Sequence, residues 1–184
     1  MSIDFDSISH DFYQLRDFIL KDLSILLESP IGGNYATALL ITTACEVVGP
    51  LCYRNRGALE FFKNYLVPVV WQMVATSLYD ALRNGLAHSF ATKTIMQING
   101  SSIELGVSWK EKPHFKYNRD EATIYINIPK LAEALKRALE VYESDLKTNG
   151  ELRDLFRERR QKERHVNVIN SDEKREWRRI ITSQ

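Results

Sequence analysis

The positions of apolar residues along the chain predict mostly helices. Between residues 8 and 28, apolar side chains recur with a period close to 3.6, which is typical of a helix that buries one face. Residues 34–54 are apolar on nearly every side, so we expect a central helix there, capped by Asn34. A third helix is expected over 58–82, and Pro68 should kink it or start a new segment.

After residue 92 the pattern changes to that of short strands. Residues 92–100, 101–109 and 122–128 are rich in residues that favour strands. Asn99-Gly100 between the first two is a hairpin signal. We therefore expect a small β insertion over about 93–128.

The last regular helix begins near Pro129, a residue that favours the first turn, and ends at Asn149-Gly150. The face that it should bury carries Leu131, Leu135, Ala138, Leu139 and Tyr142. Residues 150–184 follow as a highly charged helical extension, which we expect to be solvated or, as an alternative, to contact phosphate. The predicted fold is mainly α: a four-helix bundle over 1–149 with a β insertion before its last core helix.

Composition narrows the class of protein. Apolar residues make up 44% of the chain, and 25 basic against 24 acidic residues give a net charge of +1. These values are typical of a soluble globular protein, so attraction to a polyanion would need a local basic patch. The apolar segments 36–51 and 66–82 fall short of the ~20 residues of a membrane span. We interpret both as buried helices and expect no membrane partner.

Two further features favour a cytoplasmic location. Cys45 and Cys52 lie two helical turns apart, too far for a disulfide, and should be reduced core residues. The N-terminal residues lack the basic start and apolar run of a signal peptide.

Arg83, Asn84 and His88 stand together at the end of the third apolar helix. An arginine fork matches phosphate oxygens and stays charged, while histidine moves protons near neutral pH. Such a pair can cleave RNA without a metal or cofactor, because the 2′-hydroxyl attacks the adjacent phosphorus and leaves a 2′,3′-cyclic phosphate. Asn84 can hydrogen-bond His88 one turn later and fix its tautomer.

The spacing of Arg83 and His88 raises a geometric problem. Five residues place the two side chains ~140° apart around a helix, so they do not share a face. A helix break near Gly85 could bring them together. A second subunit could do so as well, with two copies of the motif meeting across a twofold axis. The nearly all-apolar helix 34–54 also favours a homodimer.

The motif R-x-x-x-x-H, with asparagine directly after the arginine, resembles that of the HEPN superfamily of small helical bundles. Many members are dimeric ribonucleases of bacterial toxin, abortive-infection and CRISPR systems. The resemblance covers residues 8–90 and 129–147 and implies a HEPN-like bundle, an RNA substrate and an antitoxin or defence-system protein as partner. It maps the motif onto Arg83, Asn84 and His88, and Glu46 resembles an acid that many members carry on an earlier core helix.

Other residues have weaker assignments. Asp80 either supports the site or forms a helix-end ion pair with Arg83. Arg54 and Arg56, in the loop after the second helix, are weak candidates for RNA binding.

A second match to the motif and one departure from the family pattern also matter. Arg160 and His165 repeat the motif spacing, but they lack the asparagine and the apolar helix, so we interpret this match as a solvated coincidence. Phe90 stands where one toxin subgroup has a tyrosine that receives adenylate, so control by that modification is not expected.

Two classes of function stay open. The first is a metal-independent endoribonuclease that acts as a dimer in a defence, toxin or stress system. The second is a non-catalytic HEPN-like module that binds a nucleotide, RNA or a protein partner. The chain has no glycine-rich phosphate loop, no zinc spacing and no nucleophile elbow.

Overall fold

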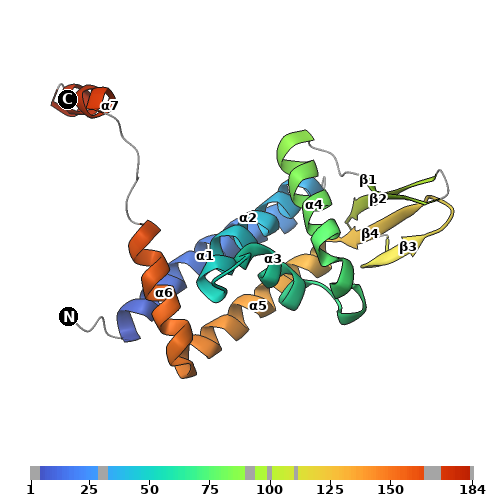
Figure 1. Cartoon of the computed structure of the whole chain (residues 1–184), viewed down its shortest axis with the longest axis horizontal. Coiled ribbons are helices and arrows are strands. Elements are labelled where there is room, and N and C mark those ends of the chain that lie inside the picture. The colour runs from blue at the N-terminus through green and yellow to red at the C-terminus, as the bar shows by residue number, and fades with distance from the viewer. Residues whose placement is uncertain are drawn as a thin grey trace.

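The computed structural model describes residues 5–28, 33–89, 94–98, 101–109, 112–163 and 171–182. Within these ranges the chain is mainly helical, with one small sheet (Figure 1). The elements are α1 (Phe5–Glu28), α2 (Asn34–Cys52), α3 (Gly57–Phe61), the π-helix η1 (Phe62–Leu66), the 3₁₀-helix η2 (Val69–Val74), α4 (Ala75–Ser89), β1 (Thr94–Ile98), β2 (Ser101–Ser108), β3 (Lys116–Asn118), β4 (Thr123–Asn127), α5 (Ile128–Thr148), α6 (Gly150–Glu163) and α7 (Ser171–Thr182).

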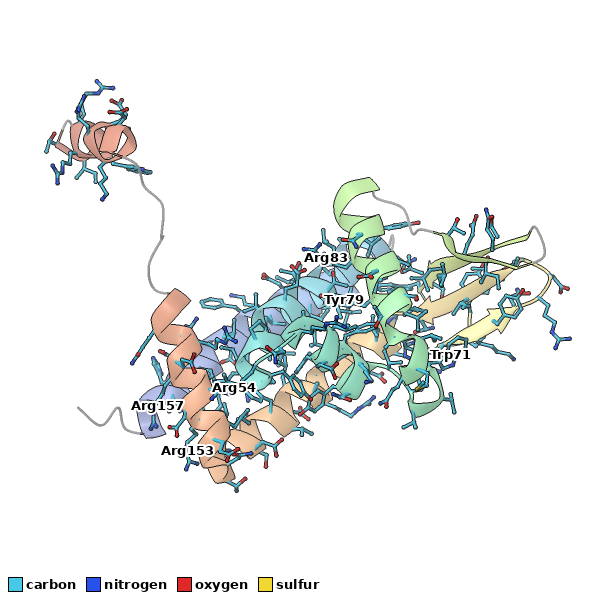
Figure 2. All side chains as sticks on the ribbon, viewed as in Figure 1. Arg54, Trp71, Tyr79, Arg83, Arg153 and Arg157 are labelled. Carbon is cyan, nitrogen blue, oxygen red and sulfur yellow. The ribbon has the colours of Figure 1, made fainter. Side chains whose placement is uncertain are left out.

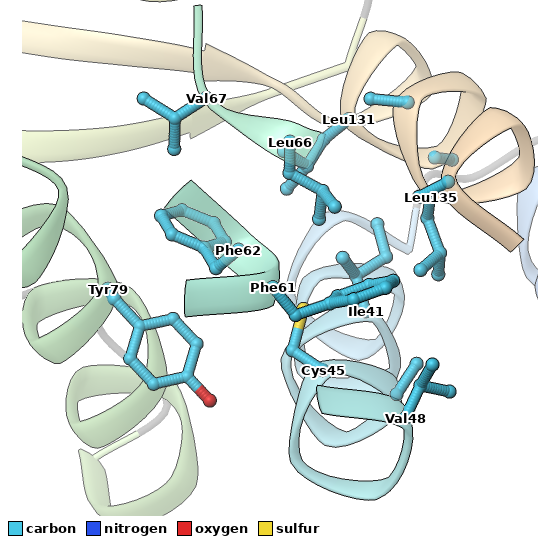
Figure 3. Close-up of a cluster of buried hydrophobic side chains, with 14 of the residues drawn as sticks. Ile41, Cys45, Val48, Phe61, Phe62, Leu66, Val67, Tyr79, Leu131 and Leu135 are labelled. Atoms are coloured by element: carbon cyan, nitrogen blue, oxygen red, sulfur yellow. The ribbon is translucent and has the colours of Figure 1, made fainter. Parts of the chain in front are cut away.

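Helix α2 is central, as its apolar composition predicted. It contacts α1, α3, α4, α5 and α6. Its side chains Ile41, Cys45 and Val48 are fully buried and lie in one cluster with Phe61 and Phe62 (Figure 3). Among the described residues, α2 is also the one helix long and apolar enough to span a membrane by length and composition, and half of that stretch is buried inside the bundle.

The start of α2 corrects one expectation. Asn34 does not cap the helix: Gly33 holds the N-cap position without a side-chain hydrogen bond. Asn34 instead lies in the first turn, and its buried Oδ1 has no hydrogen-bond partner in the part of the chain that the structure describes.

Two glycines bring the end of α2 against the start of α3. A Cβ on Gly49 would lie 2.3 Å from the carbonyl oxygen of Gly57, so the two backbones pack in direct contact. Arg56, just before Gly57, has a left-handed φ of 48° that turns the chain at this point. The close approach places Arg56 beside the last turns of α2.

The predicted third helix is interrupted at Pro68. Val67 has an extended backbone, with φ −100° and ψ 127°, as expected for a residue that precedes proline. A new helical segment follows from Val69 and continues as α4. Helix α4 runs through Gly85 to Ser89 without interruption, so the expected alternative of a break near Gly85 is wrong.

The sheet has the strand order β1-β2-β4-β3. The pairing of β1 with β2 is antiparallel, as the hairpin signal predicted, although Asn99-Gly100 lies outside the described residues. The pairing of β2 with β4 is parallel, and β3 is a three-residue strand that the sequence pattern did not predict. Helix α5 begins at the sheet, where the Asn127 side chain accepts a hydrogen bond from the Lys130 backbone N–H at 3.1 Å. All five side chains expected on its inner face are buried.

The charged extension divides into two different parts. Helix α6 is not solvated as expected, because Leu155 and Phe156 are buried and the Phe156 ring lies 6.4 Å from that of Phe12. Arg153 donates to the carbonyl oxygens of Leu146 and Lys147 and so fixes α6 to the end of α5. Helix α7 does match the expectation: it lies apart from the bundle, and its described side chains are exposed (Figure 1).

Candidate functional site

Arg83 on α4 meets Glu46 on α2 where the two helices pack together. The Arg83 Nε donates to Glu46 Oε1 at 2.5 Å, and Arg83 Nη1 donates to Asn84 Oδ1 at 2.9 Å. Leu82 and Leu86, on the neighbouring flank of α4, are buried and hold the helix against the core, while Arg83 is 40% exposed beside them. The structure therefore brings three of the predicted site residues into one polar cluster, which Figure 2 locates by the label of Arg83.

The charge of this cluster is fixed but its contribution to stability is small. The hydrogen bond and the charge of Glu46 raise the pKa of Arg83, so the guanidinium stays cationic. The side chains of Arg83 and Glu46 are 40% and 39% exposed. An ion pair at that exposure typically contributes less than ~1 kcal/mol to stability. The partner of Arg83 is Glu46 on a different helix, rather than the neighbouring Asp80.

An open hollow of about 400 Å³ borders the cluster. Its lining residues are Glu46, Pro50, Arg56, Gly57, Ala58, Leu59, Tyr79 and Asp80. Three predicted residues therefore share one surface hollow: Glu46 from α2, Arg56 from the loop and Asp80 from α4. A phosphate-sized group that entered it would meet lining residues that include Arg56 and Glu46, the partner of Arg83.

Arg54 does not belong to this hollow. Its side chain pairs with Glu158 on α6 at 3.1 Å, and its carbonyl oxygen accepts from Arg159 at 2.9 Å. It lines a separate cavity of about 580 Å³ between the end of α2 and the start of α6. The side chain of Arg54 thus fastens the loop to α6, which removes it from the candidate site.

His88 lies on the same unbroken helix as Arg83, five residues later. Its side chain lies outside what the structure describes, as do Phe90 and His165. The predicted hydrogen bond between Asn84 and His88 stays a prediction, and Asn84 Oδ1 accepts from Arg83 instead. Because α4 does not break, the ~140° separation of the two motif positions applies to each single chain.

Tyr79 is a residue of this region that sequence reasoning missed. It lines the hollow one turn before Arg83, and its ring packs 5.1 Å from that of Phe62. Its buried hydroxyl oxygen has no hydrogen-bond partner among the described residues. Burial, followed by the charges of neighbours that include Glu46, raises the pKa of Tyr79. A tyrosine in an apolar helix gives no sequence signal beyond its four-residue spacing from Arg83.

The remaining ionisable groups lie elsewhere. Burial, together with the charge of Lys130, lowers the pKa of His114 to about 4. Cys45 and Cys52 are free thiols, as expected, and burial raises the pKa of both. Over the part of the chain that the structure describes, no three His, Cys, Asp or Glu side chains form a group that could hold a metal ion.

Comparison with protein-family models, with curated proteins and with solved structures gave no match for this chain.

Proposed function

We propose that this protein is a HEPN-type, metal-independent endoribonuclease that acts as a homodimer in a toxin, defence or stress system. The observation that carries the proposal is the cluster of Arg83, Asn84 and Glu46 beside an open hollow, with His88 five residues later on the same helix. A half-exposed ion pair contributes little to stability, so its position on an apolar helix is better explained by a ligand. An arginine there suits a phosphodiester.

The reaction follows from the two motif side chains. The guanidinium of Arg83 binds the phosphate oxygens and stabilises the charge that develops on them. Neutral His88 takes the proton of the 2′-hydroxyl, and O2′ attacks the phosphorus. The bond from phosphorus to O5′ breaks, and the leaving oxygen takes up a proton. The products are a 2′,3′-cyclic phosphate and a 5′-hydroxyl, and no step in this sequence uses a metal.

Dimerisation would complete the site. Because α4 is unbroken, one chain separates Arg83 from His88 by ~140° around the helix. A twofold axis near Gly85 would set Arg83 of one chain beside His88 of the other. Repulsion among two arginines and two histidines would favour the neutral, basic form of the imidazole.

The outer side of α2 supports a dimer as well. Tyr35 is 43% exposed, and Leu39, Leu40 and Val47 are only partly buried by their own chain. This partly apolar side runs along the same helix as Glu46, so a second copy would cover it next to the site. Sedimentation at micromolar concentration should show a dimer, and a monomer would count strongly against the proposed composite site.

The activity is tested with purified protein and total RNA in EDTA. We expect cleavage by the wild type, and a loss of about 10²- to 10⁴-fold in His88→Ala and Arg83→Ala. Arg160→Ala changes the matching arginine of the second motif and should cleave normally. Cleavage that disappears in EDTA and returns with a divalent ion would overturn the metal-free mechanism. Loss of activity in Arg160→Ala with normal activity in Arg83→Ala would show that the wrong motif was chosen.

A second function, binding of a protein partner, is favoured by the surface of η2. Val69, Val70 and Met73 are 79%, 85% and 95% exposed. Contiguous apolar side chains this exposed are a recognised mark of a protein interaction site. We propose that an antitoxin or defence-system protein docks there. Met73→Lys should then abolish binding of a protein encoded by a neighbouring gene and leave RNA cleavage unchanged. Unchanged binding would count against this surface.

A further inference from the structure

Two buried tyrosines differ in how their hydroxyls are used. The Tyr142 hydroxyl donates to the carbonyl oxygen of Leu51 at 3.0 Å. The Tyr79 hydroxyl, buried to a similar degree, has no partner within the described part of the chain. Buried polar atoms are nearly always hydrogen-bonded, because an unsatisfied one loses its bonds to water without replacement. The exception at Tyr79 therefore calls for a physical reason.

The surroundings of Tyr79 limit what its partner can be. Its oxygen is inaccessible to solvent, so a bound RNA strand cannot reach it directly. Packing of the ring against Phe62 fixes the direction of the hydroxyl (Figure 3). A protein group that lines the same hollow and moves when the site is occupied can then accept from this hydroxyl. The carboxylates that line the same hollow are Glu46 and Asp80.

Of these two, Glu46 is the one already bonded to the arginine that is proposed to bind phosphate. In the free protein Glu46 Oε1 holds the Nε of Arg83. A guanidinium that turns its N–H groups toward a phosphate weakens that bond and leaves the carboxylate short of a donor. Burial raises the pKa of Tyr79, so its hydroxyl keeps its proton at neutral pH and can donate.

We propose that Tyr79 is a positioning residue for the Arg83 site, whose hydroxyl donates to the Glu46 carboxylate when Arg83 leaves it to bind a phosphodiester. Glu46 thus exchanges one protein donor for another when Arg83 turns toward the phosphate. Tyr79 touches no substrate in this exchange. The inference rests on the proposed ribonuclease function and adds to it the group that stabilises the substrate-bound state.

The exchange has a kinetic signature. The contact from Tyr79 to Glu46 forms whenever phosphate is bound, in the ground state and in the transition state alike. Loss of such a uniform interaction raises KM and leaves kcat unchanged. We expect Tyr79→Phe to raise KM for a short single-stranded RNA about 10-fold, with kcat within about 3-fold of the wild type. Removal of an unsatisfied hydroxyl should also leave the melting temperature equal or higher.

The matched control is Tyr142→Phe, which removes a satisfied hydroxyl on α5. It should lower the melting temperature and leave KM and kcat unchanged. The pairing itself is tested by the double variant Glu46→Gln/Tyr79→Phe. Its KM should equal that of Glu46→Gln alone, because Tyr79 acts through the carboxylate.

The experiment measures KM, kcat and melting temperature for the wild type and these variants, on an RNA sequence that the protein cuts in total RNA. If the wild type cleaves RNA and the Tyr79→Phe variant has the same KM, the inference is overturned and the ribonuclease function stands. Additive effects of the two single substitutions overturn the exchange with Glu46. A wild type that neither binds nor cleaves RNA overturns the proposed function and the inference together.

Discussion

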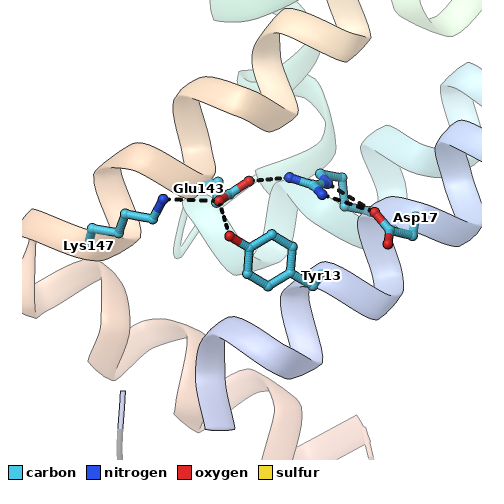
Figure 4. A network of polar contacts seen from close by, with 5 residues as sticks. Tyr13, Asp17, Glu143 and Lys147 are labelled. Atoms are coloured by element: carbon cyan, nitrogen blue, oxygen red, sulfur yellow. Dashed lines mark hydrogen bonds and ion pairs between the residues drawn. The ribbon is translucent and has the colours of Figure 1, made fainter. Parts of the chain in front are cut away.

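Two glutamates, Glu143 on α5 and Glu46 on α2, each accept a hydrogen bond from an arginine of another helix, but they differ in how fully their oxygen atoms are used. Glu143 accepts from the Tyr13 hydroxyl at 2.7 Å, from Lys147 at 3.1 Å and from Arg16 (Figure 4). Its side chain is 15% exposed. Although burial alone would raise the pKa of Glu143, these donors lower it.

Glu46 lies in the opposite situation. It is 39% exposed, its partner among the described residues is Arg83, and a hollow with an unsatisfied tyrosine hydroxyl lies beside it. The network of Glu143 is saturated and joins α1 to α5, as a structural contact should. The cluster of Glu46 keeps unused hydrogen-bonding capacity next to open space, which is what a ligand requires. The contrast teaches that saturation, rather than the presence of an ion pair, separates a structural network from a candidate site.

The largest expected effect is on RNA cleavage, and it appears when Arg83 and Arg16, the arginines of the two regions, are each replaced by lysine. Arg83→Lys removes the planar fork that binds phosphate, so kcat/KM for RNA cleavage should fall by ~100-fold with little change in stability. Arg16→Lys should leave cleavage unchanged and lower the free energy of unfolding by about 1 kcal/mol. Cleavage kinetics and urea unfolding of both variants provide the measurement. Equal loss of cleavage in the two variants would erase the distinction between the regions.

Substitution of the two carboxylates should affect stability differently: the loss should be larger for Glu143 than for Glu46. Glu143→Gln leaves the partly buried Arg16 with Asp17 as its remaining charge partner among the described residues, and we expect a loss of about 2 kcal/mol in the free energy of unfolding. Glu46→Gln should cost less than ~1 kcal/mol, because water replaces the lost charge at an exposed site. Urea denaturation at neutral pH compares them. A larger loss for Glu46→Gln would identify its ion pair as a structural contact.

Much of the helical fold could be predicted from apolar spacing, because α1, α2 and α5 each carry a long and regular pattern. Helix α6 was misjudged because its charged residues hid Leu152, Leu155 and Phe156, whose spacing of three and four is the signal of a buried face. Strand β3 is too short for a period to show.

The candidate site was only partly predictable. The local spacing of Arg83, Asn84 and His88 is visible in the sequence, and Glu46 was singled out by its resemblance to an acid on an earlier core helix of the HEPN superfamily. Arg83 pairs with Glu46 rather than Asp80 because of how α2 packs against α4, and no local sequence pattern encodes that packing. The unsatisfied state of Tyr79 is likewise a property of its surroundings, so the residue gives no signal in the sequence.

A pH-dependent effect separates the Glu143 network from another polar residue, His114, which is only partly buried. Burial first, and then the charge of Lys130, hold the pKa of His114 at about 4, below its ordinary value of 6.5. The unfolded chain therefore binds a proton between pH 6.5 and 4 that the folded protein does not. The contribution of neutral His114 to the free energy of unfolding should be fully present above pH 6.5 and should be lost as pH drops through this window. Because His114 is only partly buried, we expect this loss to be about 1–2 kcal/mol.

Unfolding free energies of His114→Gln measure this contribution. In this variant the free energy of unfolding should no longer show the fall between pH 7 and pH 5 that His114 causes. Glu143, whose pKa lies below its ordinary value of 4.5, should destabilise the protein only at more acidic pH, as its carboxylate becomes protonated. If the free energy of unfolding of His114→Gln falls between pH 7 and pH 5 as steeply as that of the wild type, His114 is not the group responsible.

The most direct test of the composite Arg83–His88 site mixes two inactive variants, Arg83→Ala and His88→Ala, in equal amounts under conditions that exchange subunits. A heterodimer then holds one site with both groups intact, Arg83 from one chain and His88 from the other. With half of the dimers mixed and one of two sites restored in each, cleavage in EDTA should recover to about a quarter of the wild-type rate. A mixture that stays as inactive as its two components, although subunit exchange is shown independently, would contradict a site built from two chains.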